Sequence, residues 1–289
     1  MELELKRGGR TARVEPLGGE LVSYRDERGL EYIWGGDPAY WPGRNPLLFP
    51  IVGMLKEGKI RFDGREYAME RHGFARRREF TPAARGEDWV RLELRESAET
   101  LALYPYSFRL AVEQRLTDTG FSTAVTVANP EEGPLPFCLG AHTGFRCPLE
   151  AGERFEDYEL VFPERESCPT LLLRDGLLDR PAALPCLEDT DTLPLDYRWF
   201  DALDTLIFEG LRSRSVTLRS RKSGRGVRVS FDGFPMLAFW TMPGKKAPYL
   251  CIEPWHGCSA GTGEGPEFTD KAHCIVLAPG ESRTLAYRA

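Results

Sequence analysis

The sequence has 289 residues, of which 42% are hydrophobic and 11% aromatic, a composition that allows a large buried core and excludes an intrinsically disordered chain. The formal net charge of −6 argues against nonspecific binding to nucleic acid or to an anionic membrane, because no surplus of cations is available to neutralise phosphates. Small-molecule ligands are therefore the expected partners.

The first recognisable strands lie between residues 59 and 129, where apolar and polar residues alternate. "KIRFDGREYAM" contains Asp63-Gly64, the residue pair that a tight hairpin turn prefers. In "DWVRLELRE" the side chains of Val90, Leu92 and Leu94 share one face, which is typical of a half-buried strand. "FRLAVEQRL" and "FSTAVTVAN" repeat the alternation on either side of the turn "TDTG", so together they predict an antiparallel hairpin.

The second half of the chain is less uniform. Residues 163–198 are its least regular part, and we expect them to cross the outside of the fold and to form the rim of a cleft, because apolar pairs such as Leu171-Leu172 still need burial. Further hairpins are expected at "SVTLRSRKSGRGVRVSF" and at the C-terminal "CIVLAPGESRTLAYR". Long helical periodicity is absent, and 29 glycines and 22 prolines punctuate the strands. The sequence therefore predicts an all-β protein, a large antiparallel β-sandwich that forms one domain over residues 1–289.

The N-terminus and the cysteines indicate the cellular setting. The start "MELELKRGGR" lacks an apolar secretory core, and no run approaches the roughly 20 apolar residues that span a bilayer. A cytoplasmic location is therefore expected. The seven cysteines contain no CxxC pair and are expected to be reduced and mostly buried. His256 near Cys258, and His273 beside Cys274, lack the spacing of a zinc knuckle, so no metal site is predicted.

Two of the four histidines occupy similar settings. His72 in "ERHGFAR" and His142 in "GAHTGF" are each followed closely by glycine and phenylalanine. Glycine lets the backbone turn or approach a ligand, and imidazole exchanges protons near neutral pH. On this spacing alone, hydrogen-bonded histidines at strand ends are the favoured interpretation for both residues.

A carboxylate ends the apolar strand predicted at "APYLCIEPWHG". Alternation places Tyr249, Cys251 and Glu253 on one face of that strand. Desolvation there disfavours the charged form of Glu253 and raises its pKa toward the range of a general base. The alternative is a glutamate that forms a structural ion pair with one of the many arginines.

Tryptophans and cations supply the remaining candidates for ligand contact. Trp41, Trp240 and Trp255 offer flat apolar faces on which sugar rings stack, although most tryptophans fill cores. The run "RHGFARRREF" concentrates arginines, and alternation is expected to divide them between two faces, which favours a solvated edge over a phosphate clamp. Lys245-Lys246 is interpreted as a solvated turn.

Five segments in order, "GRNPLLFPIVG", "HGFAR", "LGAHTGF", "DTLIF" and "CIEPWHG", resemble the aldose 1-epimerase superfamily, particularly its LacX-related branch. The resemblance spans nearly the whole chain. It implies a galactose mutarotase-like β-sandwich with an open cleft that holds an aldose between an acid and a base. It implies no cofactor.

The resemblance also implies roles for individual residues. Glu253 is similar to the catalytic base of the family and His142 to its catalytic acid. His72 resembles the second histidine near the ring oxygen, Arg44 the arginine that orients the sugar, and Asp204 the aspartate that binds hydroxyl groups. Trp240 completes the expected substrate-binding set. In the relatives proline usually follows the catalytic histidine, whereas this chain has Thr143, which puts the fixed orientation of His142 in doubt.

The activity implied is the interconversion of α and β anomers of a hexose, with a base that accepts the proton of the C1 hydroxyl and an acid that protonates the ring oxygen. One alternative is a hexose-6-phosphate 1-epimerase, in which Arg76 or Lys245 would contact the phosphate. Another is a noncatalytic sugar-binding protein on the same fold, which the departure at Thr143 would favour. The sequence leaves open whether the protein is a monomer or a homodimer.

Overall fold

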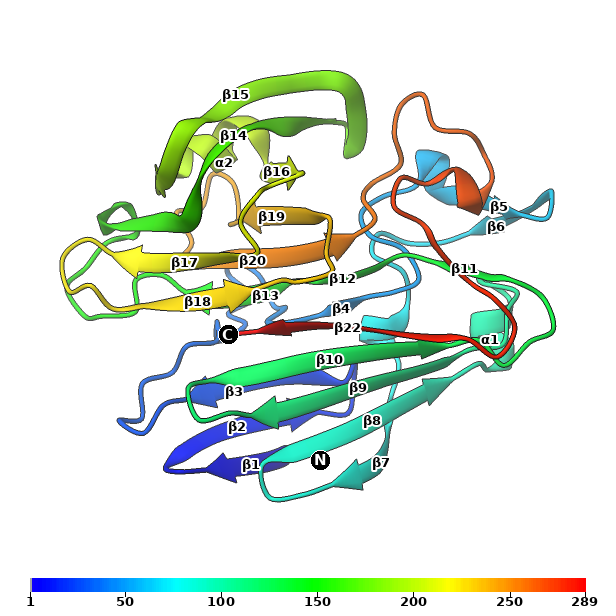
Figure 1. Ribbon diagram of the computed structural model, residues 1–289, viewed down its shortest axis with the longest axis horizontal. Coiled ribbons are helices and arrows are strands. Elements are labelled where there is room, and N and C mark those ends of the chain that lie inside the picture. Colours follow the sequence, from blue (N-terminus) through cyan, green and yellow to red (C-terminus); the bar gives the residue numbers. More distant parts are fainter. Residues whose placement is uncertain (1) are drawn as a thin grey trace.

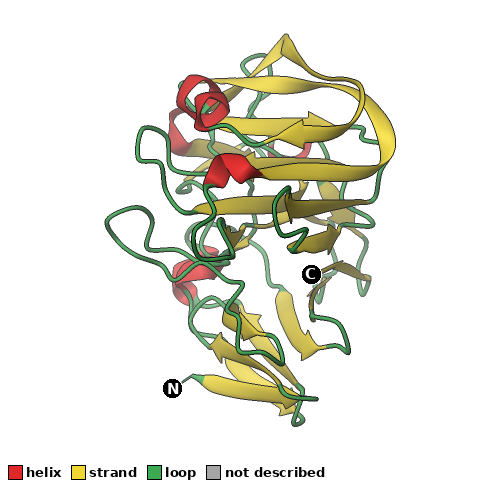
Figure 2. Ribbon diagram, turned by 90° about the vertical axis from the view of Figure 1, so that its left-hand side faces the viewer, coloured by secondary structure: helices red, strands yellow, loops and turns green. Residues whose placement is uncertain are grey.

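The computed structural model describes residues 2–289, and strands make up most of its regular structure (Figures 1 and 2). In this described part the α-helices are short, α1 (Ala98–Leu101) and α2 (Tyr197–Leu203). Single turns of 3-10 helix occupy Lys56–Gly58, Ala75–Arg77, Phe155–Asp157 and Phe268–Asp270. No helix within residues 2–289 is long and apolar enough to cross a bilayer.

A 15-stranded antiparallel sheet dominates residues 2–289. Its hydrogen-bonded order is β4 (Leu47–Leu48), β12 (Leu139–Ala141), β20 (Tyr249–His256), β19 (Met236–Trp240), β16 (Thr205–Glu209), β14 (Tyr158–Arg174), β17 (Ser215–Ser220), β18 (Gly226–Ser230), β22 (Ser282–Arg288), β10 (Phe121–Ala128), β9 (Arg109–Leu116), β8 (Trp89–Arg95) and β7 (Thr81–Arg85). Two further strands join at the side, because β13 (Thr143–Arg146) pairs with β20 and β15 (Leu177–Pro194) pairs with β14.

Smaller sheets complete the architecture. They are β1 (Leu3–Arg7) with β2 (Arg10–Glu15) and β3 (Glu20–Arg25), β5 (Lys59–Phe62) with β6 (Arg65–Ala68), and β11 (Leu135–Phe137) with β21 (Ile275–Leu277). Val14 and Leu21 of the N-terminal sheet share one continuous buried cluster with Val112 of β9 and Leu206 of β16. This core stabilises the layers against each other, because burial of apolar surface is the main favourable term in folding. The predicted antiparallel β-sandwich is confirmed.

The strands expected between residues 59 and 129 are also confirmed. Val90 and Leu92 of β8 are buried on the predicted face. Strands β9 and β10 form the predicted hairpin, in which Leu116 lies opposite Phe121. In the turn between β5 and β6, Asp63 and Gly64 have φ of 50° and 75°, the left-handed values that a tight primed turn requires.

Two expectations for the second half of the chain are wrong. Residues 163–198 are largely regular, since β14 and β15 form a long hairpin that arches over one end of the large sheet (Figure 1). Register shifts interrupt the hairpin, and they hide its alternation in the sequence. The C-terminal segment is not a hairpin, because β21 pairs with β11 whereas β22 pairs with β10 and β18. Strands β21 and β22 therefore pair with strands that are distant in the sequence and not with each other.

Candidate active site

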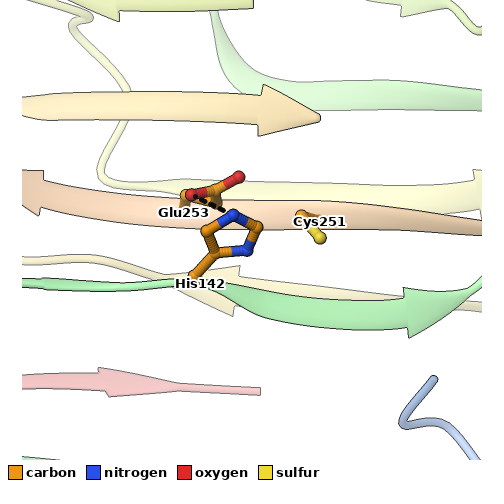
Figure 3. A group of neighbouring side chains, drawn as sticks. All are labelled: His142, Cys251 and Glu253. Carbon is orange, nitrogen blue, oxygen red and sulfur yellow. Dashed lines mark ion pairs between the residues drawn. The ribbon is translucent and has the colours of Figure 1, made fainter. Parts of the chain in front are cut away.

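The register of the large sheet brings His142 and Glu253 together. Strand β12 pairs with β20 through Gly140 opposite Trp255, and β13 continues the same register with Thr143 opposite Ile252. His142, between β12 and β13, therefore lies directly across from Glu253. Its Nε2 is 3.4 Å from Glu253 Oε2, and Figure 3 shows the imidazole ring beside the carboxylate.

The carboxylate of Glu253 is buried without a compensating partner. The residue is 0% exposed, and neither carboxylate oxygen accepts a hydrogen bond from any protein group among residues 2–289. Burial raises the pKa of Glu253 well above its usual value. The alternative interpretation as a structural ion pair with an arginine finds no support, since within the described chain the titratable side chain that lies within 4.0 Å of the Glu253 carboxylate is His142.

The imidazole of His142 is packed among tryptophans. Its ring lies 4.8 Å from that of Trp41 at an interplanar angle of 30°, and it meets the ring of Trp240 edge-on at 5.5 Å. Burial lowers the pKa of His142 to about 3. Its Nδ1 has no hydrogen-bond partner in the described protein. The imidazole of His142 is therefore neutral near pH 7.

His72 is fixed by the segment that carries Gly53. Gly53 N donates to His72 Nδ1 at 3.1 Å, and His72 N donates in return to Gly53 O at 2.9 Å. Because Nδ1 accepts a hydrogen bond, the ring proton of neutral His72 resides on Nε2. A side chain at Gly53 would collide with Ser259, which explains the glycine. His72 thus presents a defined donor, and its ring centroid lies 5.7 Å from that of His142.

These side chains border a cavity of about 240 Å³. Of the predicted residues, the structure brings Glu253, His142, His72, Asp204 and Trp240 to this cavity, together with Trp41 and Trp255. Leu173 and Gly176 of the β14–β15 hairpin also line it, so the expected rim is present. Asp204 occupies the C-cap of α2 with φ of 63°, and its Oδ2 accepts a hydrogen bond from Thr205.

Arg44 is the predicted residue that does not line the cavity. Its Nε donates to the carbonyl of Gly35 at 3.1 Å, and its Nη1 lies 3.3 Å from Glu15 Oε1. The guanidinium is therefore committed to neighbours in the N-terminal part of the fold. The motif that contains Arg44 leads into a buried segment, but the motif does not determine the direction in which this long side chain points.

Arg71 and Arg76 line the cavity instead; Arg71 is exposed, as the predicted solvated edge requires, whereas Arg76 is half-buried. The segment is not a strand. His72 and Gly73 adopt φ of 67° and 70°, and a 3-10 turn follows at Ala75–Arg77. Alternation therefore does not apply to this segment. Neither Arg71 nor Arg76 forms an ion pair with a carboxylate of the described chain, whereas Arg77 pairs with Glu70.

Several polar atoms at the cavity lack partners in the protein. Within residues 2–289 the buried atoms without a hydrogen bond include His142 Nδ1, both oxygens of Glu253, Trp255 Nε1 and Arg76 Nε. Buried polar groups are almost always hydrogen-bonded in folded proteins. Donors and acceptors that converge without partners are therefore suited to a polar ligand. A larger depression of about 890 Å³, lined by residues such as Tyr24 and Arg288, includes none of these atoms.

A buried thiol lies beside the pair of His142 and Glu253. Ligand atoms of His142, Cys251 and Glu253 lie within 4.8 Å of one another (Figure 3), which is close enough for a metal ion to bridge them. Burial raises the pKa of the Cys251 thiol well above its usual value, and a neutral thiol is a poor metal ligand. The absence of a metal site stays a prediction. All seven cysteines are free, and five of them are buried, as expected.

The unpaired carboxyl should make stability depend on pH. Above pH 4.5 the unfolded chain loses the proton of Glu253 while the folded protein keeps it, so the contribution of Glu253 to the free energy of unfolding falls as pH rises toward the higher folded-state pKa. The slope for one proton is at most about 1.4 kcal/mol per pH unit. Glu253→Gln should remove this decline, as urea unfolding at a series of pH values would show. An unchanged slope in the variant would contradict the burial argument.

Comparison with known proteins places the chain in a family. The aldose 1-epimerase family model matches residues 1–289. The plasmid-borne and chromosomal LacX proteins of Lactococcus lactis subsp. lactis are each 41% identical over 295 residues, which cover 99% of this chain and 98% of theirs. A galactose mutarotase related enzyme from Lactobacillus acidophilus superimposes with a TM-score of 0.95 at 27% identity, covering 100% of this chain and 96% of that one. A galactose mutarotase-like protein from Lactobacillus casei gives 0.89 at 28% identity, with 100% and 99% covered. The fold is a galactose mutarotase-like β-sandwich, and the chain belongs to the aldose 1-epimerase family.

Proposed function

We propose that this protein is a cofactor-independent aldose 1-epimerase that interconverts the α and β anomers of a hexose by acid/base ring opening and closure. The observation that carries the proposal is the cross-strand pair of His142 and Glu253, whose facing atoms lie 3.4 Å apart and which border a cavity of unpartnered polar atoms. Family membership supports an isomerase that acts on a sugar. The chemistry itself needs one base and one acid.

Glu253 and His142 carry out the two proton transfers of the reaction. The carboxylate of Glu253 accepts the proton of the C1 hydroxyl while the imidazolium of His142 protonates the ring oxygen, and the bond between C1 and the ring oxygen breaks. Rotation about C1–C2 presents the other face of the aldehyde, and the reverse transfers close the ring. Burial favours the neutral form of each group. Sugar hydroxyls that bond to the carboxylate favour its charged form, so the proton moves to His142.

The other predicted residues would hold the sugar. His72 offers its Nε2–H near His142, Asp204 offers a carboxylate to hydroxyl groups, and Trp240 offers an apolar edge for the ring. Sugar sites commonly combine aromatic faces with a few placed polar groups.

The test is the rate of anomer exchange in freshly dissolved sugars. Polarimetry or NMR on glucose, galactose and other aldoses should show exchange faster than the uncatalysed rate for at least one of them. Calorimetry on the same panel separates the alternative of a noncatalytic binding protein. Sugar binding with an uncatalysed exchange rate for every sugar and sugar phosphate would refute the proposal and favour that alternative.

A specific observation favours a second candidate, a 1-epimerase of a phosphorylated hexose. Arg71 and Arg76 line the cavity, and neither pairs with a carboxylate of the described chain. Two guanidinium groups without counterions are suited to a phosphate. Lys245, the other cation considered from the sequence, is exposed and does not line the cavity.

Neutral variants at these arginines should therefore distinguish substrates. Arg76→Gln and Arg71→Gln are each expected to raise KM for a hexose 6-phosphate by about 10-fold or more, since a hydrogen bond to a charged group contributes about 1.5–3 kcal/mol. Lost ground-state binding of this kind leaves kcat nearly unchanged. Lys245→Gln is the control and should change neither constant. Equal KM values for free and phosphorylated hexoses in the wild type would exclude this candidate.

A further inference from the structure

The residue after His142 is tied into a buried hydrogen-bond network. Thr143 is 0% exposed, and strand alternation turns its side chain away from the face that carries His142. Its Oγ1 lies 2.7 Å from Asn45 Oδ1 and 3.0 Å from the hydroxyl of Tyr287. The Tyr287 hydroxyl donates to Asn45 Oδ1 at 2.9 Å. The three oxygen atoms thus form a triangle of close contacts on the side of the sheet opposite the cavity, in which the two hydroxyl protons supply two hydrogen bonds at a time.

The triangle joins segments that are distant in the sequence. Asn45 precedes β4, Thr143 begins β13, and Tyr287 lies on the C-terminal strand β22. Asn45 and Tyr287 are only 5% and 2% exposed. Buried hydroxyls that keep their hydrogen bonds hold the segments in place, because a departure leaves a buried polar group without a partner at a cost of about 1–3 kcal/mol.

Backbone hydrogen bonds reinforce the same contact. Gly144 N donates to Arg44 O at 2.7 Å, so the segment before β4 lies against β13. Asn45 N donates to Glu20 Oε1 at 2.5 Å, which attaches that segment to β3. The backbone at Arg44 and Asn45 is therefore held from two sides, and it carries the acceptor Oδ1 of Asn45 beside Thr143.

His142 depends on such an anchor. It lies in the gap between β12 and β13, where the pairing with β20 is interrupted. Its Nδ1 has no partner in the described chain, so no hydrogen bond at that atom orients the ring. We propose that Thr143 is a positioning residue, whose hydroxyl donates to Asn45 Oδ1 or to the adjacent Tyr287 hydroxyl and so holds His142 at the register opposite Glu253. The effect of Thr143 on catalysis rests on the proposed function, whereas its role in placing the His142 ring does not.

Substitutions at Thr143 separate the hydroxyl from the shape of the side chain. Thr143→Val keeps the shape and removes the hydroxyl, and it should lower kcat about 10- to 100-fold with little change in KM, since small misplacements of reacting groups are costly. Thr143→Ser keeps the hydroxyl and should retain most of the wild-type kcat. Thr170→Val is the matched control, because the buried Thr170 hydroxyl accepts a hydrogen bond from Ile207 N and does not line the cavity. It should lose stability but not kcat.

A double-mutant cycle tests whether the triangle acts as a unit. Tyr287→Phe removes the second hydroxyl and should lower kcat in the same direction as Thr143→Val. The double variant should be little worse than the poorer single variant, because groups that act through one network are not additive. Additive losses in kcat would contradict a shared role.

A structural readout makes the test independent of activity. NMR of the His142 ring, with crystal structures of the variants, should show the imidazole displaced from Glu253 in Thr143→Val and in place in Thr143→Ser and Thr170→Val. If the wild type accelerates no sugar, the proposed function fails, and the position of the ring still decides the inference. A Thr143→Val protein with an unmoved ring and wild-type kcat overturns the inference, even if its free energy of unfolding is lowered.

Discussion

Glu253→Gln is expected to lower kcat for anomer exchange by roughly 10²- to 10⁴-fold, the usual contribution of a positioned general base. The amide keeps the shape of the side chain but cannot accept the proton of the C1 hydroxyl. Because the wild-type carboxylate has no hydrogen-bond partner in the described chain, the substitution breaks no structural bond. KM should change much less than kcat. Polarimetry or NMR exchange rates at saturating sugar would measure both constants.

Glu166→Gln provides a matched control for this variant. Glu166 is also buried, at 1% exposed, but its carboxylate accepts hydrogen bonds from the backbone of Arg212 and Ser213, and it lies outside the cavity. Its substitution should reduce the free energy of unfolding and leave kcat near the wild-type value. Retention of wild-type kcat by Glu253→Gln would remove Glu253 from the mechanism.

His142→Gln should cause a loss of similar size, because general-acid catalysis also contributes roughly 10²- to 10⁴-fold. The variant keeps a polar side chain beside Glu253 but cannot carry the proton to the ring oxygen. Combined with Glu253→Gln, it should lower kcat by much less than the product of the two single losses, since acid and base act as one unit. Exchange rates of the single and double variants would measure this.

His256→Gln is the control for the histidine. Nδ1 of His256 is hydrogen-bonded to the carbonyl of His273 at 2.7 Å, and the residue does not line the cavity. Its substitution should leave kcat unchanged. Fully multiplicative losses in the double variant at His142 and Glu253 would indicate that these residues act in separate steps.

The burial of His142 and Glu253 lowers the stability of the fold, and the proposed chemistry gives a reason for this burial. Two ionisable side chains without hydrogen bonds lower the stability of the fold, since burial of unsatisfied polar groups is unfavourable. The same burial makes the carboxylate of Glu253 a stronger base and the imidazolium of His142 a stronger acid than in water, because each group is less stable in its charged form when it is buried. A polar substrate would supply the missing partners.

The local pattern of the sequence predicted most of the fold. Alternation identified β8, β9 and β10, and Asp63-Gly64 identified the hairpin of β5 and β6. Such signals are readable because each is set by neighbours within a few residues. The β14–β15 hairpin and the partners of β21 and β22 were not predicted, because bulges break the alternation and long-range pairing decides the C-terminal strands.

The candidate site, like the fold, was predicted in part from the sequence and was decided in part by the tertiary structure. Residue type and motif order in the sequence determined the family, and they singled out Glu253, His142 and His72, all of which border one cavity. Only the tertiary structure decided which long side chains reach that cavity. Arg44 is held by Gly35 and Glu15 elsewhere, while a turn at His72 and Gly73 brings Arg76 to it.

The role of Thr143, which stands where the relatives usually have proline, also depends on the tertiary structure. By itself, the sequence determined that a proline expected from the resemblance is absent and that a hydroxyl stands in its place. Only the fold supplies Asn45 and Tyr287, 242 residues apart, as partners for that hydroxyl. The physical reason is that a side-chain hydrogen bond depends on where distant segments meet, whereas strand alternation and turn preference depend on adjacent residues.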